Sequence, residues 1–179
     1  MTFSPLTIAF VGLPGSGKST VGRQLARHLD IRFFDSDAVI ENRLGFSIRE
    51  FFEREGEDAF RDLEQSVICE LTQQDACILS TGGGVVVREA NRDRLRLRCH
   101  TVYLHSEPEE VFRRLRNDRH RPLLQVADPL SRLKELYLVR DPLYRAASHI
   151  VVETGRPVVS ALVTTILTRL RAAGALPAT

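Results

Sequence analysis

Residues 12–20, GLPGSGKST, combine glycines with a lysine and hydroxyl side chains. Lys18 is one of only two lysines in the chain, which uses arginine for nearly all of its 25 Lys and Arg residues. The compact ammonium of Lys18 can reach between phosphates, and the Ser19 hydroxyl can bind a Mg²⁺ ion that bridges them. Backbone N–H groups can wrap a phosphate tail closely only where side chains are absent and positive φ is permitted. That role falls to Gly12, Gly15 and Gly17, so the spacing G-x-x-x-x-G-K-S predicts a nucleoside triphosphate site.

Two aspartates lie two positions apart at the end of a predicted strand, in the segment FFDSD. On an extended chain, Asp35 and Asp37 would project to the same side, toward the crevice at the carboxyl ends of parallel strands. One carboxylate can help to hold a magnesium shell, and the other can bind a hydroxyl group of a second substrate. A structural explanation is also open, because aspartate at a strand exit often caps the next helix.

Further arginines and glycines suit an anionic acceptor. Arg61 lies on a predicted helix in GEDAFRDLE, and residues 82–84 are three glycines that expose backbone N–H groups after a strand. Arg121 lies in RPLL, within an expected exposed loop, and Arg140 precedes a proline that we expect to end a helix. Any one of these arginines alone is typical of a solvated surface. Their combination at these places favours a functional site, in which the glycine loop could contact a small polar molecule.

Alternating apolar and amphipathic segments are expected to position these residues. Short apolar runs predict strands at residues 6–12, 31–37, 77–80, 100–105 and 149–154. Helices are predicted at residues 18–29, 38–44, 47–55 (capped by Ser47), 58–72, from Ser106 as a cap onward, 130–140 and 158–173. An exposed loop is predicted at residues 116–129. This alternation predicts an α/β fold with a five-stranded parallel sheet flanked by helices on both faces.

Length and composition are those of an ordinary globular chain. Its 179 residues suffice for one core, so we expect a single domain spanning 1–179. A net charge of +2 does not indicate a nucleic-acid partner, and the arginine-rich stretch 92–98 is interpreted as a solvated helix end. Neither a signal peptide nor a membrane span is predicted. The cysteines Cys69, Cys77 and Cys99 are expected to be reduced and buried. We therefore expect a cytoplasmic monomer with no nucleic-acid or membrane partner.

The chain resembles the shikimate kinases, P-loop kinases of small molecules that are similar to nucleoside monophosphate kinases. The resemblance extends from about residue 7 to residue 171 and rests on motifs in the family's order: GLPGSGKST, FFDSD, GEDAFRDLE, STGGGVV, TVYLH, RPLL and VRDPLYR. The first motif is common to many families, whereas the DSD, GE-x-x-FR-x-x-E and triple-glycine motifs together are much more specific. The resemblance implies a P-loop kinase fold with an acceptor-binding helical segment at about 36–64 and a mobile lid at about 115–128.

The resemblance also implies a role for each motif residue. ATP would bind to Gly15, Ser16, Gly17, Lys18, Ser19, Thr20, Arg114, Arg121 and Arg156. Shikimate would bind to Asp37, Arg61, Gly82, Gly83, Gly84 and Arg140. Mg²⁺ would be held by Ser19 and Asp35, and the catalytic residues would be Lys18, Asp37 and Arg121. Ser148 departs from the family, in which an aspartate often follows the alanine, and is interpreted as a surface change.

The implied reaction is the ATP-dependent phosphorylation of a shikimate hydroxyl, which gives shikimate 3-phosphate and ADP in the biosynthesis of chorismate and the aromatic amino acids. Two alternatives stay open. Another small-molecule kinase, such as a gluconate or nucleoside monophosphate kinase, would share the loop, sheet and lid, but would not need the acceptor set formed by Asp37, Arg61, Gly82–Gly84 and Arg140. A non-catalytic nucleotide-responsive binding protein would be expected to lack Lys18, Ser19 or Asp37, all of which are present.

Overall fold

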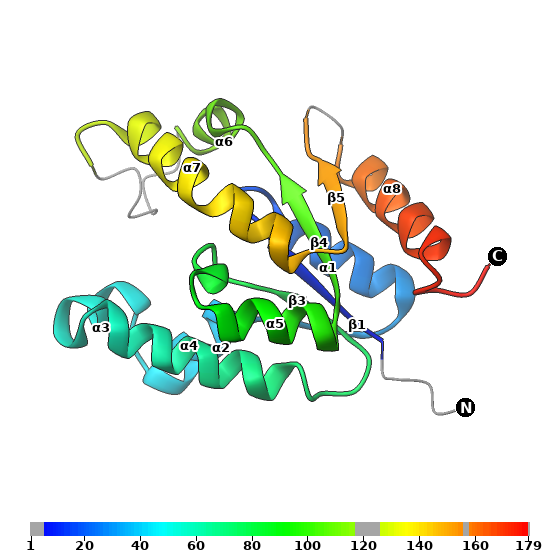
Figure 1. Cartoon of the computed structure of the whole chain (residues 1–179), viewed down its shortest axis with the longest axis horizontal. Coiled ribbons are helices and arrows are strands. Elements are labelled where there is room, and N and C mark those ends of the chain that lie inside the picture. Colours follow the sequence, from blue (N-terminus) through cyan, green and yellow to red (C-terminus); the bar gives the residue numbers. More distant parts are fainter. Residues whose placement is uncertain (1–5, 117–125, 156–157, 179) are drawn as a thin grey trace.

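The computed structural model describes residues 6–116, 126–155 and 158–178. Within these ranges a five-stranded parallel sheet runs through the molecule in the order β2-β3-β1-β4-β5 (Figure 1). Its strands are β1 Thr7–Val11, β2 Arg32–Asp35, β3 Cys77–Ser80, β4 His100–His105 and β5 Ile150–Glu153. The predicted α/β fold and parallel sheet are confirmed. Because β1 lies between β3 and β4, the loop that follows β1 opens where the strand order reverses, which is the usual ligand position in such sheets.

Helices cover both faces of the sheet, as predicted (Figure 1). They are α1 Lys18–Leu29, α2 Ser36–Leu44, α3 Ile48–Glu55, α4 Glu57–Leu71, α5 Glu89–Arg98, α6 Pro108–Leu115, α7 Pro129–Ala147 and α8 Val159–Ala172, with a short 3₁₀ helix η1 at Val85–Val87. Helices α1 and α8 pack on each other on one face. On the other face, α4 packs against α2, α3 and α5, and α5 packs against α7.

The central strand β1 supplies alternate side chains to two hydrophobic cores. Ile8 and Phe10 pack with apolar residues of α1 and α8. Ala9 and Val11 belong to the cluster formed with residues of α2, α4, α5 and α7. All four are fully buried. A strand alternates its side chains between the two faces of a sheet, and a parallel sheet is normally covered on both, so this strand is apolar throughout.

Helix α7 contradicts one expectation from the sequence. The sequence predicted a helix that ends near Arg140, before Pro142, whereas α7 spans Pro129–Ala147. A proline inside a helix removes one N–H donor and crowds the carbonyl four residues earlier, which here belongs to Leu138. Leu138 lies on the solvent side of α7 and is 74% exposed, so water can satisfy that carbonyl. Beyond the proline, Tyr144 is fully buried, and its packing keeps the last turns helical.

Serines at the ends of helices follow the sequence predictions only in part. Ser47 caps α3 by accepting from a backbone N–H in its first turn, as predicted. The prediction that Ser106 caps α6 is wrong. Its hydroxyl bonds to the hydroxyl of Thr154, which follows β5, and the N-cap residue of α6 is Glu107. The interpretation of Ser148 as a surface change is also wrong. Ser148 is buried at the end of α7, where its carbonyl accepts from Arg96.

The three cysteines of the chain differ in burial. Cys77 and Cys99 are buried as predicted, whereas Cys69 on α4 is partly exposed, and all three are free. Burial raises the pKa of the Cys99 thiol to about 12, which makes it unreactive. In the part of the chain that the structure describes, no helix has both the length and the apolar character needed to cross a membrane.

Candidate active site

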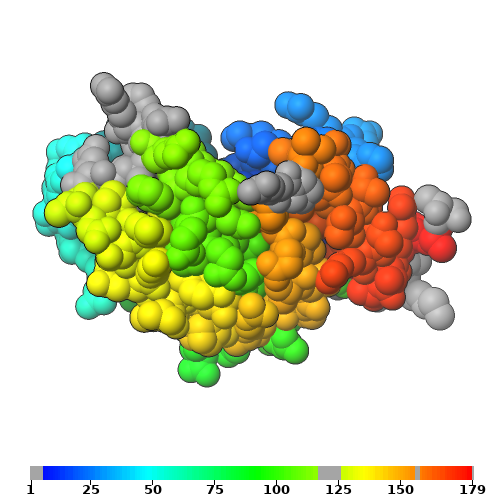
Figure 2. All heavy atoms as spheres, turned by 90° about the horizontal axis from the view of Figure 1, so that it is seen from above, coloured from blue at the N-terminus to red at the C-terminus, as the bar shows by residue number. Residues whose placement is uncertain are grey.

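The strands end on one face of the molecule, which Figure 2 shows from above with α3 and α7 to the left and α8 to the right. Three cavities lie on this face. We name them the arginine cavity (about 560 Å³, lined by Arg61 and Arg140), the P-loop cavity (about 300 Å³) and the Arg114 cavity (about 480 Å³). The P-loop cavity shares Asp37 with the arginine cavity and Gly15 with the Arg114 cavity, so it adjoins both.

The loop after β1 has the backbone that its glycines predict. Gly12, Gly15 and Gly17 have φ angles of +151°, +80° and +94°, which other residues rarely adopt. A Cβ atom on Gly15 would lie 2.5 Å from the side chain of Leu115 on α6, so space also requires glycine there. Gly17 is the N-cap of α1, which points the amino end of that helix at the P-loop cavity.

Lys18 is buried at the start of α1. Its ammonium donates to the carbonyls of Gly12, at 2.8 Å, and Leu13, at 2.9 Å. The lysine lines the P-loop cavity together with Ser19 and Asp37. These contacts hold a positive charge beside the glycine-rich backbone, where the sequence predicted a phosphate-binding cation.

Asp35 and Asp37 differ from the predicted extended arrangement. β2 ends at Asp35 and α2 begins at Ser36, so Asp37 lies in the first turn of a helix. The Asp35 Oδ1 atom caps that helix by accepting from the backbone N–H of Asp37 at 3.0 Å. Its Oδ2 atom accepts from the Ser19 hydroxyl at 2.6 Å. The structural explanation considered for this carboxylate, a helix cap, is therefore confirmed, and the helical turn still leaves Asp37 in the P-loop cavity.

Burial and like charges act together on Asp37. They raise its pKa to about 6, with burial the largest cause, followed by repulsion from Asp35 and Glu64, while Lys18 acts in the opposite direction. A carboxylate that titrates near neutral pH is well matched to exchanging a proton with a substrate hydroxyl. Asp37 lines both the P-loop cavity and the arginine cavity, which places it where the two cavities meet.

Arg61 of α4 enters the arginine cavity as part of a buried ion pair. Its Nη1 atom donates to Glu64 Oε1 at 2.7 Å, and its Nη2 atom lies 3.3 Å from Glu57 Oε1. The side chains of Arg61 and Glu64 are only 8% and 1% exposed. Arg140, on α7, lines the same cavity, so the structure brings together two arginines that are far apart in the sequence.

Glu64 of α4 also lines the arginine cavity, although the sequence predicted no role for it. Its Oε2 atom has no hydrogen-bond partner among the described residues. Burial raises its pKa, while Arg61 and Arg140 lower it. The spacing of the two residues could have indicated a role for Glu64. Residues three apart on a helix share a face, and Arg61 is three residues before Glu64.

The triple glycine after β3 is required by close approach. A Cβ atom on Gly82 would lie 2.7 Å from Asp37 Oδ1, and one on Gly83 would lie 2.7 Å from the ring of Pro14. A Cβ atom on Gly84 would collide with the Arg61 guanidinium. None of these three glycines needs a left-handed φ, in contrast to those of the P-loop. Asp37, Pro14 of the P-loop and Arg61 therefore all pack closely against this loop.

Arg114 of α6 lies at the far side of the P-loop. Its guanidinium donates to the Thr154 hydroxyl at 3.2 Å and to the Gly155 carbonyl at 3.0 Å. Val159 and Leu162 of α8 line the same cavity and give it apolar surface. Two further residues named from the resemblance, Arg121 and Arg156, lie outside the described residues, as does most of the predicted lid.

Comparisons with known proteins agree with this geometry. A family model for shikimate kinase matches residues 14–171 of the chain. A shikimate kinase of Paracidovorax citrulli is 58% identical over 176 residues, which cover 96% of both chains. The solved shikimate kinase from Acinetobacter baumannii in complex with shikimate superposes with a TM-score of 0.90 at 41% identity, over 95% of each chain. A gluconokinase from Sinorhizobium meliloti reaches a TM-score of 0.65 at 20% identity, which indicates a shared fold alone.

These similarities decide between the readings that the sequence left open. The matched family model covers most of the chain, and the identity to shikimate kinases is high over nearly the full length of both partners. Neither the gluconate kinase alternative nor the non-catalytic binding protein is favoured. The protein is an ATP-dependent kinase that acts in the shikimate pathway. The chain belongs to the shikimate kinase family.

Proposed function

We propose that the three adjoining cavities bind one ATP and one shikimate in line. The adenosine would occupy the Arg114 cavity, the phosphates the P-loop cavity, and shikimate the arginine cavity. The observation that carries this order is the position of Asp37, which lines both the phosphate side and the acceptor side. A substrate hydroxyl bound to Asp37 would then face the terminal phosphate of ATP, which Lys18 would contact.

Arg61 and Arg140 would bind the shikimate carboxylate. A guanidinium can hold a carboxylate through two parallel N–H···O bonds, and each charge-assisted bond contributes roughly 1.5–3 kcal/mol. Glu64 and Glu57 fix the orientation of Arg61, so little side-chain freedom is lost when the ligand binds. Ile48, Phe52 and Phe60 line the same cavity and would contact the carbon ring.

Asp37 would orient the acceptor hydroxyl at C3 of shikimate and accept its proton. Phosphoryl transfer needs mainly positioning and charge stabilisation, since the protein does little covalent chemistry. Lys18 would stabilise the charge on the transferred group. A pKa of about 6 leaves Asp37 ionised in the free enzyme at neutral pH and still able to take up a proton.

Ser19 and Asp35 fit a Mg²⁺ ion that accompanies ATP. Their oxygen atoms are 2.6 Å apart, and oxygen ligands are those that Mg²⁺ prefers. Among the described residues there is no cluster of three or more metal-ligating side chains, which suits an ion that keeps water and phosphate oxygens in its shell. When bound, the ion would neutralise charge on the phosphates.

The adenine-side and lid residues complete the proposal. Arg114 and Arg156 would contact the nucleotide, and Arg121, in the lid at 115–128, would approach the phosphates when the lid closes. Closure would exclude water, which could otherwise accept the phosphoryl group. We further propose that residues 1–179 act as one monomeric domain in the cytoplasm, a compartment that suits free thiols.

Two experiments test the proposal. An ADP-release assay with shikimate, gluconate and AMP offered in parallel should give turnover with shikimate alone. Arg61→Ala should weaken shikimate binding strongly in a calorimetric titration and leave ATP binding nearly unchanged. The matched control is Arg43→Ala, which removes an arginine whose ion pair with Glu70 lies at the surface. An unchanged shikimate affinity in Arg61→Ala would remove Arg61 from the acceptor site.

A further inference from the structure

Tyr144 is a buried residue that the proposed mechanism does not use. It lies on α7, one turn after Arg140, and is fully buried. Its ring packs against the ring of Tyr103 on β4, with centroids 5.0 Å apart. Burial raises the pKa of Tyr144 to about 12, so the hydroxyl keeps its proton throughout the range in which the enzyme would be assayed.

The Tyr144 hydroxyl contacts the backbone of the arginine cavity. It donates to the carbonyl of Gly83 at 2.5 Å. Arg140 lines the same cavity and lies four residues earlier on α7, on the same side of the helix. The Tyr144 hydroxyl therefore joins the triple-glycine loop after β3 to the helix that contributes Arg140, although the two segments lie about sixty residues apart in the chain.

The contact with Gly83 has a geometric consequence. A peptide unit is planar, and in the trans form its C=O and the next N–H point in opposite directions. The described residues contain no cis peptide bond, so a carbonyl of Gly83 held by Tyr144 turns the N–H of Gly84 away from α7. Gly84 lines the arginine cavity, and its backbone lies against the Arg61 guanidinium.

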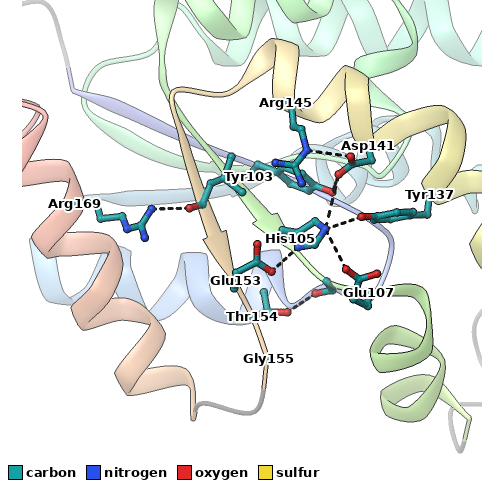
Figure 3. Close-up of polar contacts among 12 residues, drawn as sticks. Tyr103, His105, Glu107, Tyr137, Asp141, Arg145, Glu153, Thr154, Gly155 and Arg169 are labelled. Carbon is teal, nitrogen blue, oxygen red and sulfur yellow. Dashed lines mark hydrogen bonds and ion pairs between the residues drawn. The ribbon is translucent and has the colours of Figure 1, made fainter.

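Helix α7 is held on the sheet by packing as well as by hydrogen bonds. Its side chains Leu133, Leu136 and Ala147 are buried in the core. Figure 3 shows Tyr137 directed at β4, where its hydroxyl lies 2.9 Å from His105 Nε2. The position of α7 therefore depends on many contacts, and the hydroxyl of Tyr144 fixes the glycine loop relative to this helix.

We propose that Tyr144 is a positioning residue for the acceptor, which sets the Gly83–Gly84 peptide in the geometry that binds shikimate. This inference rests on the proposed assignment of the arginine cavity to shikimate. A purely structural tyrosine would stabilise the core without a selective effect on either substrate.

The neighbouring Tyr103 provides a matched control. Both rings are fully buried in the same stack, and each hydroxyl makes a hydrogen bond, but that of Tyr103 goes to Asp141 rather than to a residue that lines the arginine cavity. Tyr144→Phe and Tyr103→Phe each remove one oxygen atom and keep the ring. Loss of stability should therefore be similar in the two variants, whereas the effect on shikimate should differ.

The experiment measures KM for shikimate, KM for ATP and kcat, each well below the thermal unfolding midpoint of the variant. Tyr144→Phe should raise the KM for shikimate about tenfold, equivalent to about 1.4 kcal/mol, and leave the KM for ATP within twofold. Tyr103→Phe should leave both within twofold. An unchanged KM for shikimate in Tyr144→Phe, or an equal change in Tyr103→Phe, would overturn the inference.

A second measurement separates this inference from the proposed function. Arg61→Ala is assayed in parallel, and a normal KM for shikimate in that variant would refute the assignment of the cavity itself.

Discussion

The triple glycine allows an active-site acid to be displaced without altering the acid itself. Gly82→Ala would place a Cβ atom 2.7 Å from Asp37 Oδ1 and 3.2 Å from Glu64 Oε2. An ordinary contact is at least about 3.4 Å, so the Asp37 carboxylate must move by about 0.7 Å. The displaced atoms form the end of a side chain, so the backbone should hold and stability should change little.

Catalysis should respond much more strongly than stability. A misplacement of about 1 Å in a reacting group can cost about 100-fold in rate, so we expect kcat to fall by about 10- to 100-fold in Gly82→Ala. The KM for ATP should stay within about threefold, because the atoms nearest to the added Cβ belong to Asp37 and Glu64 rather than to the P-loop. Steady-state kinetics and a thermal unfolding curve on the same preparation measure the two effects together.

The matched comparison is Gly84→Ala, which lies two residues away and meets the Arg61 guanidinium instead of Asp37. That variant should raise the KM for shikimate, with a smaller effect on kcat. Identical kinetic changes in the two variants would show that the loop responds as a whole, and would refute the argument that each glycine accommodates one particular group. A Gly82→Ala enzyme with wild-type kcat would refute the role of Asp37.

Two further substitutions test the buried charges. Asp37→Asn should stabilise the free protein above about pH 6. The pKa of Asp37 is raised from 3.8 to about 6, so ionisation of this carboxyl lowers the free energy of unfolding at neutral pH. The gain in stability should be on the order of 3 kcal/mol and should disappear as the pH falls toward 4. Urea unfolding at pH 4 and pH 8 measures this, and equal gains at both would contradict it. Glu64→Gln should destabilise the protein by about 3 kcal/mol and raise the KM for shikimate, because it leaves the buried Arg61 charge without its carboxylate partner. Glu70→Gln, at an exposed ion pair, is the control and should change neither.

The sequence predicted best those features that depend on neighbouring residues. The phosphate-binding loop could be predicted because Gly15, Gly17 and Lys18 are a local pattern with a strand before and a helix after it. The parallel sheet could be predicted because apolar runs alternate with amphipathic segments. Asp37 was placed correctly at the crevice although the local conformation was wrong, since the end of a parallel strand leads there whether or not a helix begins at once.

The features that could not be predicted depend on contacts between distant segments. The continuation of α7 past Pro142 depends on the burial of Tyr144 against β4, which no local pattern contains. A second reason for the triple glycine could not be predicted. The sequence suggested exposed N–H donors, and the structure adds that Gly82 and Gly84 lie close against side chains of α2 and α4. Only the assembled fold shows which side chains those are.

The same contacts explain why acceptor binding and phosphoryl transfer should be coupled in this enzyme. Gly83 lies against Pro14 of the P-loop on one side and bonds to Tyr144 of α7 on the other. A movement of α7 would therefore be transmitted to the P-loop through the glycine loop at residues 82–84. Substitutions along this line should change KM for shikimate and kcat together, whereas a substitution at Glu57, which contacts Arg61 from the exposed side, should change KM alone.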